Sequence, residues 1–316
     1  MSGELRFDRL TGEWVNIVGH RQARPNLPAG GCPFCVGGLE APDAYDTRWF
    51  TNRWPAFGPG APVDPAAAVG AGVTSLPAAG ASEVVLYSAR HEGSLASLGV
   101  AQIRKVVDLW AARTADLMAR PEVEYVLVFE SRGAEVGATI HHPHGQIYGY
   151  PMVPPSPARE AAHARTVGGD PIADELDAEL ADGRRVVHDG GDWVAWVPYA
   201  SPDPYGMRIA PRTRVGRLDE LDDDGRDGLA AALGDALGRY DRLWRDDPEA
   251  SPIFPYLMWF HQAPAHDTGE YHLHVHLAPP QRAPGVARYV AAGELGSGTF
   301  SNPVVPEEAA ATLRSV

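Results

Sequence analysis

The segment HHPHGQIYGYP, residues 141–151, places three histidines within four positions and then a glutamine. Ile147 and Tyr148 in this segment are typical of a β-strand, in which successive side chains point to opposite faces of a sheet. One face of such a strand would carry three polar side chains: His142, His144 and Gln146. The segment therefore predicts a strand that presents a functional row of imidazole and amide groups.

A second segment, HLHVHLAPP at 272–280, repeats this alternation with histidine at each polar position. As a strand it would send three imidazoles to one face: His272, His274 and His276. A single histidine on a strand is commonly an ordinary surface residue, whereas three imidazoles on one face are costly to bury without a role. We therefore expect this second strand to have a functional role.

The elements around the two histidine segments follow the same order in both halves of the chain. The periodicity predicts strand, helix and strand at 83–88, 95–118 and 123–131, and again at 193–198 with 205–211, 218–244 and 255–261. This repetition indicates a duplication. We expect an α+β fold of two similar halves, 1–167 and 168–316, each a mainly antiparallel sheet with a packed helix.

Two segments read as connections rather than as elements of the halves. Residues 58–82 are rich in proline, glycine and alanine, which predicts a long surface loop. The acidic segment 168–192 predicts a linker between the halves.

The composition excludes several classes of protein. The 316 residues carry a formal net charge of −14, whereas a phosphate backbone requires a basic face, so we expect no nucleic-acid partner. Two cysteines, Cys32 and Cys35, form no disulfide framework, and the sequence has neither a signal-peptide pattern nor a membrane-spanning apolar stretch. We therefore expect a cytoplasmic protein without a membrane partner.

Seven segments of the chain occur in the order shown by one enzyme family. They are GEWVNIVGHRQARP, CPFC, FTNRWPAF, SARHEGSL, FESRGAEVGATIHHPHGQIYGYP, FHQAP and HLHVHLAPP. In these segments the chain resembles the histidine-triad superfamily, and its H-x-H-x-Q form resembles the transferase branch typified by galactose-1-phosphate uridylyltransferase. The resemblance implies histidine-triad-like halves, a homodimer, and the substrates UDP-glucose and galactose 1-phosphate.

The chemistry of the first histidine segment is intelligible from its residues. A neutral imidazole nitrogen can attack phosphorus, which divides a nucleotidyl transfer into two in-line displacements. By the resemblance His144 is this nucleophile, and it carries uridylate between the two sugar phosphates. Triad hydrolases have histidine where Gln146 stands, and an amide has no group that titrates near neutrality and activates water. Gln146 therefore suits an intermediate that waits for a sugar phosphate.

Two metal sites are expected. The spacing of CPFC at 32–35 lets two thiolates reach one tetrahedral metal, although a redox pair or two unrelated thiols are alternatives. The resemblance implies a structural zinc with four ligands: Cys32, Cys35, His91 and His142. It also implies a second metal, iron or a second zinc, with three imidazoles and a carboxylate as ligands: His261, His274, His276 and Glu160. His272 would be a spectator.

The resemblance also implies the substrate contacts. Arg21 and Arg24 would meet the nucleotide phosphates, in the family often across the dimer interface. Asn52 would contact uracil, and Phe34 would pack on the base. The remaining candidates are two phosphate donors and one sugar ligand: Ser131, Thr139 and Glu294. Ser131 stands where many family members have asparagine.

Three functions are compatible with these motifs. The first is a UDP-glucose:hexose-1-phosphate uridylyltransferase that works through His144. The second is a sister nucleotidyl transferase or phosphorylase that uses ADP-sugars or dinucleoside polyphosphates and shares the fold and the nucleophile. The third is a non-catalytic metal-binding protein. His144 and Gln146 argue against the third function, because a zinc site requires neither residue.

Overall fold

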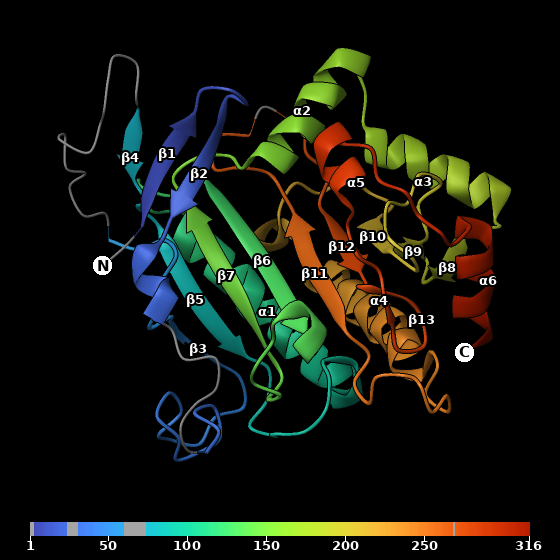
Figure 1. Ribbon diagram of the computed structural model, residues 1–316, viewed down its shortest axis with the longest axis horizontal. Helices are drawn as coiled ribbons and strands as arrows, with labels where there is room; N and C mark the ends of the chain where they lie inside the picture. The colour runs from blue at the N-terminus through green and yellow to red at the C-terminus, as the bar shows by residue number, and fades with distance from the viewer. Residues whose placement is uncertain (1–2, 24–30, 60–73, 268) are drawn as a thin grey trace.

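The computed structural model describes residues 3–23, 31–59, 74–267 and 269–316 (Figure 1). Within these residues nine strands form one antiparallel sheet. In spatial order the strands are β3 (Arg48–Thr51), β5 (Ala81–Leu86), β7 (His144–Tyr150), β6 (Tyr125–Arg132), β11 (Tyr256–His261), β12 (His274–Ala278), β10 (Met207–Pro211), β9 (Trp193–Trp196) and β8 (Val186–Asp189). The expected α+β class is confirmed.

The two halves of the chain share this sheet. Strand β6 of the first half pairs with β11 of the second, from Tyr256 opposite Arg132 to Trp259 opposite Phe129. On either side of this central pair lie the two histidine strands, β7 and β12. The sequence predicted a sheet in each half, but it did not predict that backbone hydrogen bonds make them continuous. The division at residue 167 stays a proposal.

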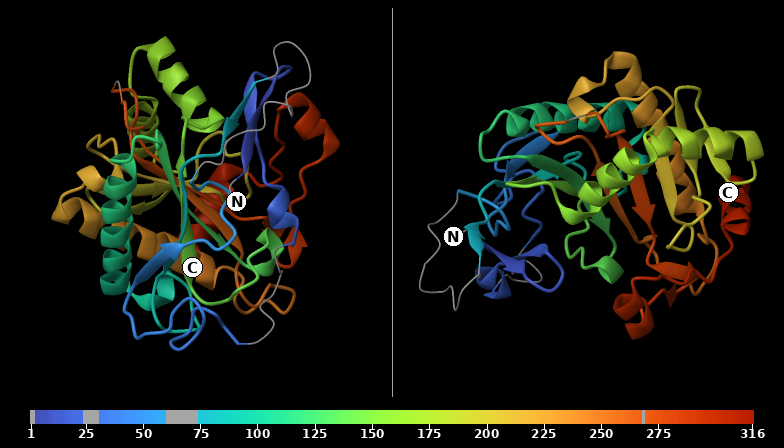
Figure 2. Two further views of the ribbon diagram at one scale, coloured as in Figure 1. Left: turned by 90° about the vertical axis from the view of Figure 1, so that its left-hand side faces the viewer. Right: turned by 90° about the horizontal axis from the view of Figure 1, so that it is seen from above.

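Two long helices cover one face of the sheet, α1 (Val100–Met118) and α4 (Asp223–Arg242). Figure 1 shows both helices behind the sheet, and Figure 2 shows them from above along the same side. Their apolar residues recur at helical spacing and are fully buried, as Trp110 and Leu233 illustrate. Asp222 caps α4 by accepting a hydrogen bond from the Gly225 amide. The long helices predicted at 95–118 and 218–244 are thus present.

The face of the nine-stranded sheet that lies away from α1 and α4 carries a smaller sheet. A three-stranded antiparallel sheet, β2 (Glu13–Ile17), β1 (Glu4–Asp8) and β4 (Ser75–Pro77), lies in front of the larger sheet in Figure 1. The remaining helices and strands are η1 (Gly19–Ala23), η3 (Ala96–Leu98), η4 (Ala134–Val136), α2 (Pro155–Val167), α3 (Pro171–Asp182), η5 (Leu218–Glu220), β13 (Gln281–Ala283), β14 (Val286–Ala287), α5 (Ala292–Ser297) and α6 (Pro306–Ser315). Within the described ranges, no helix is both long and apolar enough to cross a membrane.

Both predicted connections need correction. The expected linker at 168–192 is wrong, because it contains α3 and β8. Asp170 begins α3 by accepting hydrogen bonds from the amides of Ile172 and Ala173, and Leu176 buries its apolar side. In the expected loop at 58–82, residues 75–77 form β4 and the last two residues begin β5, whereas 60–73 lie outside the described residues.

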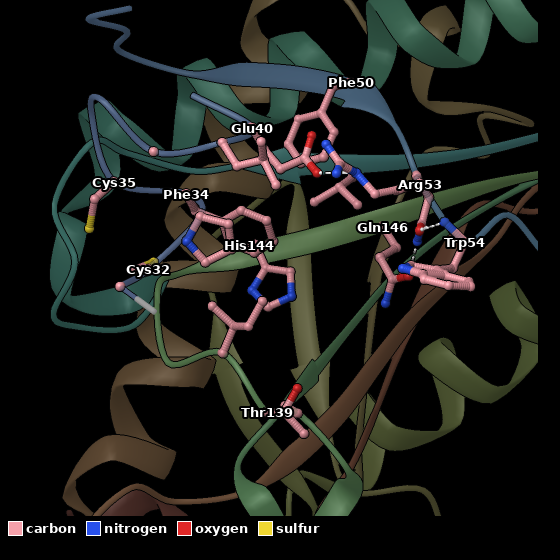
Figure 3. Close-up of a pocket in the computed structure, with 18 of the residues that line it drawn as sticks. Cys32, Phe34, Cys35, Glu40, Phe50, Arg53, Trp54, Thr139, His144 and Gln146 are labelled. Carbon is pink, nitrogen blue, oxygen red and sulfur yellow. Dashed lines mark hydrogen bonds and ion pairs between the residues drawn. The ribbon is translucent and has the colours of Figure 1, made fainter. Parts of the chain in front are cut away.

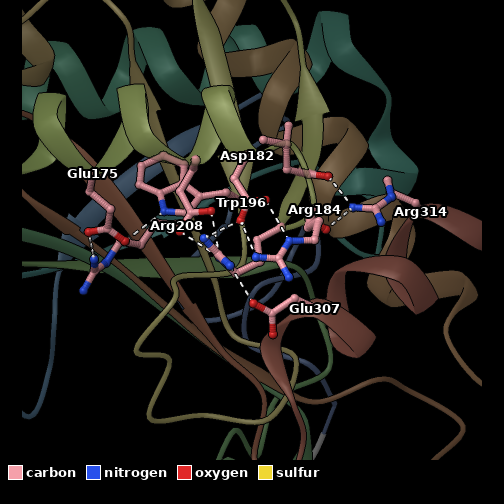
Figure 4. A network of polar contacts seen from close by, with 10 residues as sticks. Glu175, Asp182, Arg184, Trp196, Arg208, Glu307 and Arg314 are labelled. Carbon is pink, nitrogen blue, oxygen red and sulfur yellow. Dashed lines mark hydrogen bonds and ion pairs between the residues drawn. The ribbon is translucent and has the colours of Figure 1, made fainter.

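A network of ion pairs attaches α3 and α6 to the outer strands of the second half (Figure 4). The buried Arg185 guanidinium binds Glu179 of α3 at 2.8 Å and Glu307 of α6 at 2.5 Å. Arg208 of β10 pairs with Glu175 of α3, which also accepts a hydrogen bond from the Trp196 indole. These charges are retained in the interior because each one has partners.

A second buried ion pair joins α1 to the first half of the sheet. Arg113 of α1 binds both carboxylate oxygens of Glu83 on β5, at 2.7 and 2.8 Å. The two side chains are only 5% and 3% exposed, and the guanidinium lies over the Trp49 ring at 3.6 Å. Removing one partner would leave the other charge buried and unpaired.

Replacing Arg113 by alanine is therefore expected to lower the free energy of unfolding by about 3–5 kcal/mol. Urea denaturation followed by circular dichroism measures this loss. The double variant Glu83→Gln/Arg113→Met should lose less, because it leaves no isolated charge. Asp116→Ala is the matched control, since Asp116 is 64% exposed and also pairs with Arg113. If Arg113→Ala and Asp116→Ala lowered the free energy of unfolding equally, the prediction would be contradicted.

Candidate functional site

A cavity of about 870 Å³ opens on the face of the sheet opposite α1 and α4 (Figure 3). Its walls come from residues 31–40, from 50–54 at the end of β3, from 136–140 before β7, and from β6 and β7. Six of the predicted substrate and catalytic residues line it: Phe34, Asn52, Ser131, Thr139, His144 and Gln146. Segments that are far apart in the sequence thus meet at one cavity.

The alternation of β7 aims the catalytic candidates into this cavity. Ile147 is buried in the core beneath the helices, whereas His144 and Gln146 line the cavity on the other face. The His144 Nδ1 atom lies 2.8 Å from the backbone oxygen of His142. Because a carbonyl oxygen only accepts, Nδ1 carries the proton and donates it, which leaves the lone pair on Nε2. The His144 ring also contacts Phe34 edge-on, with ring centroids 5.0 Å apart.

Gln146 is oriented by a neighbouring amide. The Asn52 Nδ2 atom donates to Gln146 Oε1 over 3.5 Å, and Asn52 Oδ1 accepts from the Trp54 amide at 2.9 Å. With Oε1 accepting, the Gln146 side chain has its NH₂ group to offer to a ligand. The arrangement can therefore hold an anionic oxygen beside His144.

Beneath the catalytic strand lies a polar group that the sequence did not predict. A side chain on Gly145 would place its Cβ 2.1 Å from the Tyr87 hydroxyl, so only glycine fits between His144 and Gln146. Tyr87 donates to Glu130 at 3.1 Å, and Tyr256 donates to the other carboxylate oxygen at 2.9 Å. Burial raises the pKa of Glu130 to about 7. Nothing in the periodicity distinguishes this glutamate from a surface residue of β6.

Four residues from three separate segments form a set that can hold a metal: Cys32, Cys35, His91 and His142. His142 lies two residues before β7. Their ligand atoms all lie within 4.8 Å of one another. His142 Nδ1 is 3.8 Å from each sulfur, while its Nε2 lies 2.7 Å from the Ser88 carbonyl oxygen. That contact assigns the proton to Nε2 and the lone pair to Nδ1, and burial lowers the pKa of His142, which favours the neutral ligand. Two thiolates and two imidazoles suit tetrahedral zinc.

A second set lies on the same face of the sheet in the other half: Glu160 of α2, His261 of β11, and His274 and His276 of β12. Glu160 is 2.9 Å from His261 Nδ1, 3.7 Å from His274 Nε2 and 3.9 Å from His276 Nε2. Burial lowers the pKa of His274 to about 4, so its imidazole is neutral at neutral pH. The buried His276 Nε2 has no hydrogen-bond partner among the described residues. Its lone pair is therefore not taken up by a hydrogen bond there, which suits a metal ligand.

His272 is held apart from this set. Its Nδ1 lies 2.9 Å from Asp170 and its Nε2 lies 2.9 Å from the Pro211 carbonyl oxygen. The expected row of three histidines therefore divides into His272, which precedes β12 and has its own hydrogen bonds, and two candidate ligands on β12.

Two predicted residues that the structure describes, Arg21 and Glu294, do not line the cavity. Arg21 donates to the Tyr148 hydroxyl at 3.2 Å, two residues beyond Gln146 on β7. Glu294 on α5 accepts hydrogen bonds from Arg288 and from the amides of Ala291 and Ser301. Arg24 lies outside the described residues.

The cavity also contains polar residues that the sequence reading missed, namely Glu40, Arg53 and Trp54. Glu40 follows the CPFC segment, and Arg53 and Trp54 belong to FTNRWPAF. Their closeness in the sequence to Phe34 and Asn52 could have indicated that they lie at the same cavity.

Comparisons with known proteins agree along the whole chain. Models of the N-terminal and C-terminal domains of galactose-1-phosphate uridyl transferase match residues 32–154 and 160–316. The galactose-1-phosphate uridylyltransferase of Thermotoga maritima is 36% identical over 98% of both chains, and that of Streptomyces lividans is 35% identical over 100% of this chain and 87% of its own length.

A solved structure of a uridylyltransferase superposes with a TM-score of 0.87 at 30% identity, covering 99% of this chain and 97% of its own. An ADP-glucose phosphorylase from Arabidopsis thaliana, with a TM-score of 0.73 at 24% identity, shares the fold. Together with the sequence relatives and the domain matches, these findings show that the chain is an enzyme of the galactose-1-phosphate uridylyltransferase family, which is a family of nucleotidyltransferases.

Proposed function

We propose that this enzyme exchanges uridylate between UDP-glucose and galactose 1-phosphate through a covalent intermediate on His144. The observation that carries the proposal is the 2.8 Å contact between His144 Nδ1 and the His142 carbonyl oxygen, in the wall of the cavity. It selects the tautomer in which Nε2 is a nucleophile. The names of the relatives support the choice of substrates.

In the first displacement the Nε2 lone pair of His144 attacks the α-phosphorus of UDP-glucose. The P–N bond forms as the P–O bond to glucose 1-phosphate breaks, and glucose 1-phosphate leaves with the electron pair. The hydrogen bond from Nδ1 to the His142 carbonyl stabilises the positive charge that the imidazole then carries. In the second displacement a phosphate oxygen of galactose 1-phosphate attacks the same phosphorus, and the P–N electron pair returns to Nε2.

Neither displacement requires a general acid or base. The attacking and leaving oxygens both belong to phosphates that are ionised at neutral pH, so no proton has to move. This explains why an amide at Gln146 is sufficient. We propose that Gln146, Thr139 and Ser131 donate hydrogen bonds to the α-phosphate, and that Phe34 and Asn52 contact the uridine.

The two candidate metal sets would act at a distance from the phosphorus. A zinc ion on Cys32, Cys35, His91 and His142 would have four protein ligands and would anchor the chain directly before β7. Iron or zinc on Glu160, His261, His274 and His276 would tie α2 to β11 and β12. Both assignments of the metal are proposals that rest on the chemistry of the donor sets.

We also propose a homodimer in which Arg21 and Arg24 contact the nucleotide phosphates across the subunit interface, and a cytoplasmic location. Exposed apolar side chains near the C-terminus support an interface, with Tyr289 85% and Leu295 72% exposed. Sedimentation velocity distinguishes the dimer from a monomer. We propose that Glu294 contacts the sugar. Because Glu294 does not line the cavity of its own chain, this contact requires the dimer to place α5 beside the cavity of the neighbouring subunit.

The covalent mechanism predicts a label on His144. Enzyme mixed with UDP-glucose alone should retain a uridylyl group that is labile to acid and stable to base, and initial rates with galactose 1-phosphate should give parallel lines. His144→Ala should abolish label and transfer together, whereas His141→Ala, which changes an exposed neighbour, should preserve both. Intersecting lines without a label would contradict the mechanism. Transfer from ADP-glucose in place of UDP-glucose would favour a sister activity.

Gln146 is expected to orient the phosphate rather than to accept it. Gln146→Ala should slow transfer about 10–100-fold, the cost of one hydrogen bond to a charged group at about 1.5–3 kcal/mol. The label should still form. Gln146→His supplies a titratable group, so the labelled intermediate should decay faster without acceptor. Rapid-quench measurement of label formation and decay checks both expectations, and an intermediate equally stable in Gln146→His would refute the second.

The zinc assignment predicts about one tightly bound zinc per chain at the Cys32 set. Elemental analysis of Cys32→Ser/Cys35→Ser should show that this zinc is lost, because a hydroxyl is a much poorer zinc ligand than a thiolate. His141→Ala serves as the control and should keep its zinc, since His141 is outside the set. Undiminished zinc in the double cysteine variant would remove the site from consideration.

A further inference from the structure

An ion pair inside the cavity has no role in the displacement steps described above. The Arg53 Nε atom lies 3.0 Å from Glu40 Oε1, and both residues line the cavity. Figure 3 shows the pair beside Phe50, at some remove from the imidazole of His144. Glu40 follows the Cys pair in the chain and is fixed by a hydrogen bond from its amide to the Pro33 carbonyl oxygen. Two separate segments thus deliver opposite charges to one end of the cavity.

The burial of the pair is uneven. The Glu40 side chain is 19% exposed, whereas that of Arg53 is 54% exposed. An ion pair with an exposed partner contributes little to stability. The attraction of Arg53 therefore offsets only part of the free energy that is lost when the Glu40 carboxylate leaves water. The contact with Arg53 Nε is to Oε1, and an ionised carboxylate has two oxygens with about four acceptor positions in all. The carboxylate therefore has acceptor capacity to offer to a ligand in the cavity.

The chemistry of a carboxylate limits what that ligand group can be. An ionised carboxylate only accepts hydrogen bonds, so it binds hydroxyl or N–H groups and repels phosphate. In the proposed function the α-phosphate lies at His144 and Gln146, and the ribose is the next group of the nucleotide. Its 2′- and 3′-hydroxyls are two adjacent donors that match the two oxygens of a carboxylate. Uracil, in contrast, offers one N–H donor between two carbonyl acceptors.

We propose that Glu40, oriented by Arg53, accepts hydrogen bonds from the ribose hydroxyls of the bound uridine nucleotide and selects ribonucleotides over deoxyribonucleotides. This inference rests on the proposed function, since it assumes a uridine nucleotide with its α-phosphate at His144. The base then lies toward the apolar part of the cavity, where Phe34 and Phe50 have ring centroids 5.9 Å apart and Val84 adjoins them.

Calorimetric titration with UMP and with 2′-deoxy-UMP tests the proposal without any sugar phosphate. The unmodified enzyme should bind UMP about 10-fold or more tightly than 2′-deoxy-UMP, the effect of one hydrogen bond to a charged group. Glu40→Ala should weaken UMP binding and bring the two affinities within about twofold of each other. Arg53→Gln should reduce the preference partly, because the carboxylate loses its orienting partner.

Asp46→Ala is the matched control. Asp46 forms an ion pair with Lys105, belongs to the same part of the chain and does not line the cavity. It should keep the full preference for UMP. If Glu40→Ala does not fold, as judged by circular dichroism, Glu40→Gln replaces it and should also lower the preference, since its acceptor oxygen is uncharged.

The outcomes separate this inference from the function on which it rests. An unchanged preference in a folded Glu40 variant, or an equal loss of affinity for both nucleotides, overturns the role of Glu40 while leaving the label on His144 intact. An enzyme that binds neither nucleotide and forms no label counts against the proposed function as well.

Discussion

The hydrogen bond from His144 Nδ1 to the His142 carbonyl oxygen connects the candidate metal set to the candidate nucleophile. His142 offers its own Nδ1 to the two sulfurs and its Nε2 to the Ser88 carbonyl. Its backbone oxygen is thereby held in place to accept a hydrogen bond from His144 Nδ1, and the two atoms are 2.8 Å apart. One residue thus offers its ring to the candidate metal set and, through its backbone, selects the tautomer of the candidate nucleophile.

The second half of the chain repeats this hydrogen bond with a different outcome. His274 Nδ1 lies 2.8 Å from the His272 carbonyl oxygen, which is the same relation two residues apart. Here His276 stands in the position of Gln146, and Glu160 approaches both imidazoles of β12. The second histidine strand therefore carries imidazoles that, together with Glu160 of α2, suit a metal, whereas the first carries an imidazole and an amide that line a cavity suited to a phosphate.

The central strands β6 and β11 join the two histidine strands, β7 and β12, into one sheet. β6 and β11 are hydrogen-bonded to each other, and β7 and β12 flank them. The helices α1 and α4 bury the other face, so His144 and Gln146 of β7 and the candidate ligands of β11 and β12 emerge on the side away from the helices. Close packing behind the sheet leaves little freedom for His144 to leave the cavity wall. Gly145, which is pressed against the Tyr87 hydroxyl, shows how tight that packing is.

Much of the site was predictable because it depends on local geometry. The period of two residues along a strand follows from the covalent backbone, so the alternation of His144 and Gln146 with apolar residues was sufficient to place them on one face. The Cys32 and Cys35 spacing similarly indicated a shared ligand position. The helices at 95–118 and 218–244 were recognisable from their apolar periodicity. The segment 168–192 was misread because acidic residues on α3 hid its short apolar side.

The sequence by itself therefore determined the two long helices, the outward face of the histidine segments and, through ordered motifs, the family. Only the tertiary structure decided that the halves share one sheet, that Glu130 lies beneath the catalytic strand, and that Glu40 meets Arg53 in the cavity. Local periodicity is dictated by bond geometry within a few residues. Contacts between distant segments depend instead on how the whole chain buries its apolar surface and pairs its charges, a free-energy balance that no short pattern encodes.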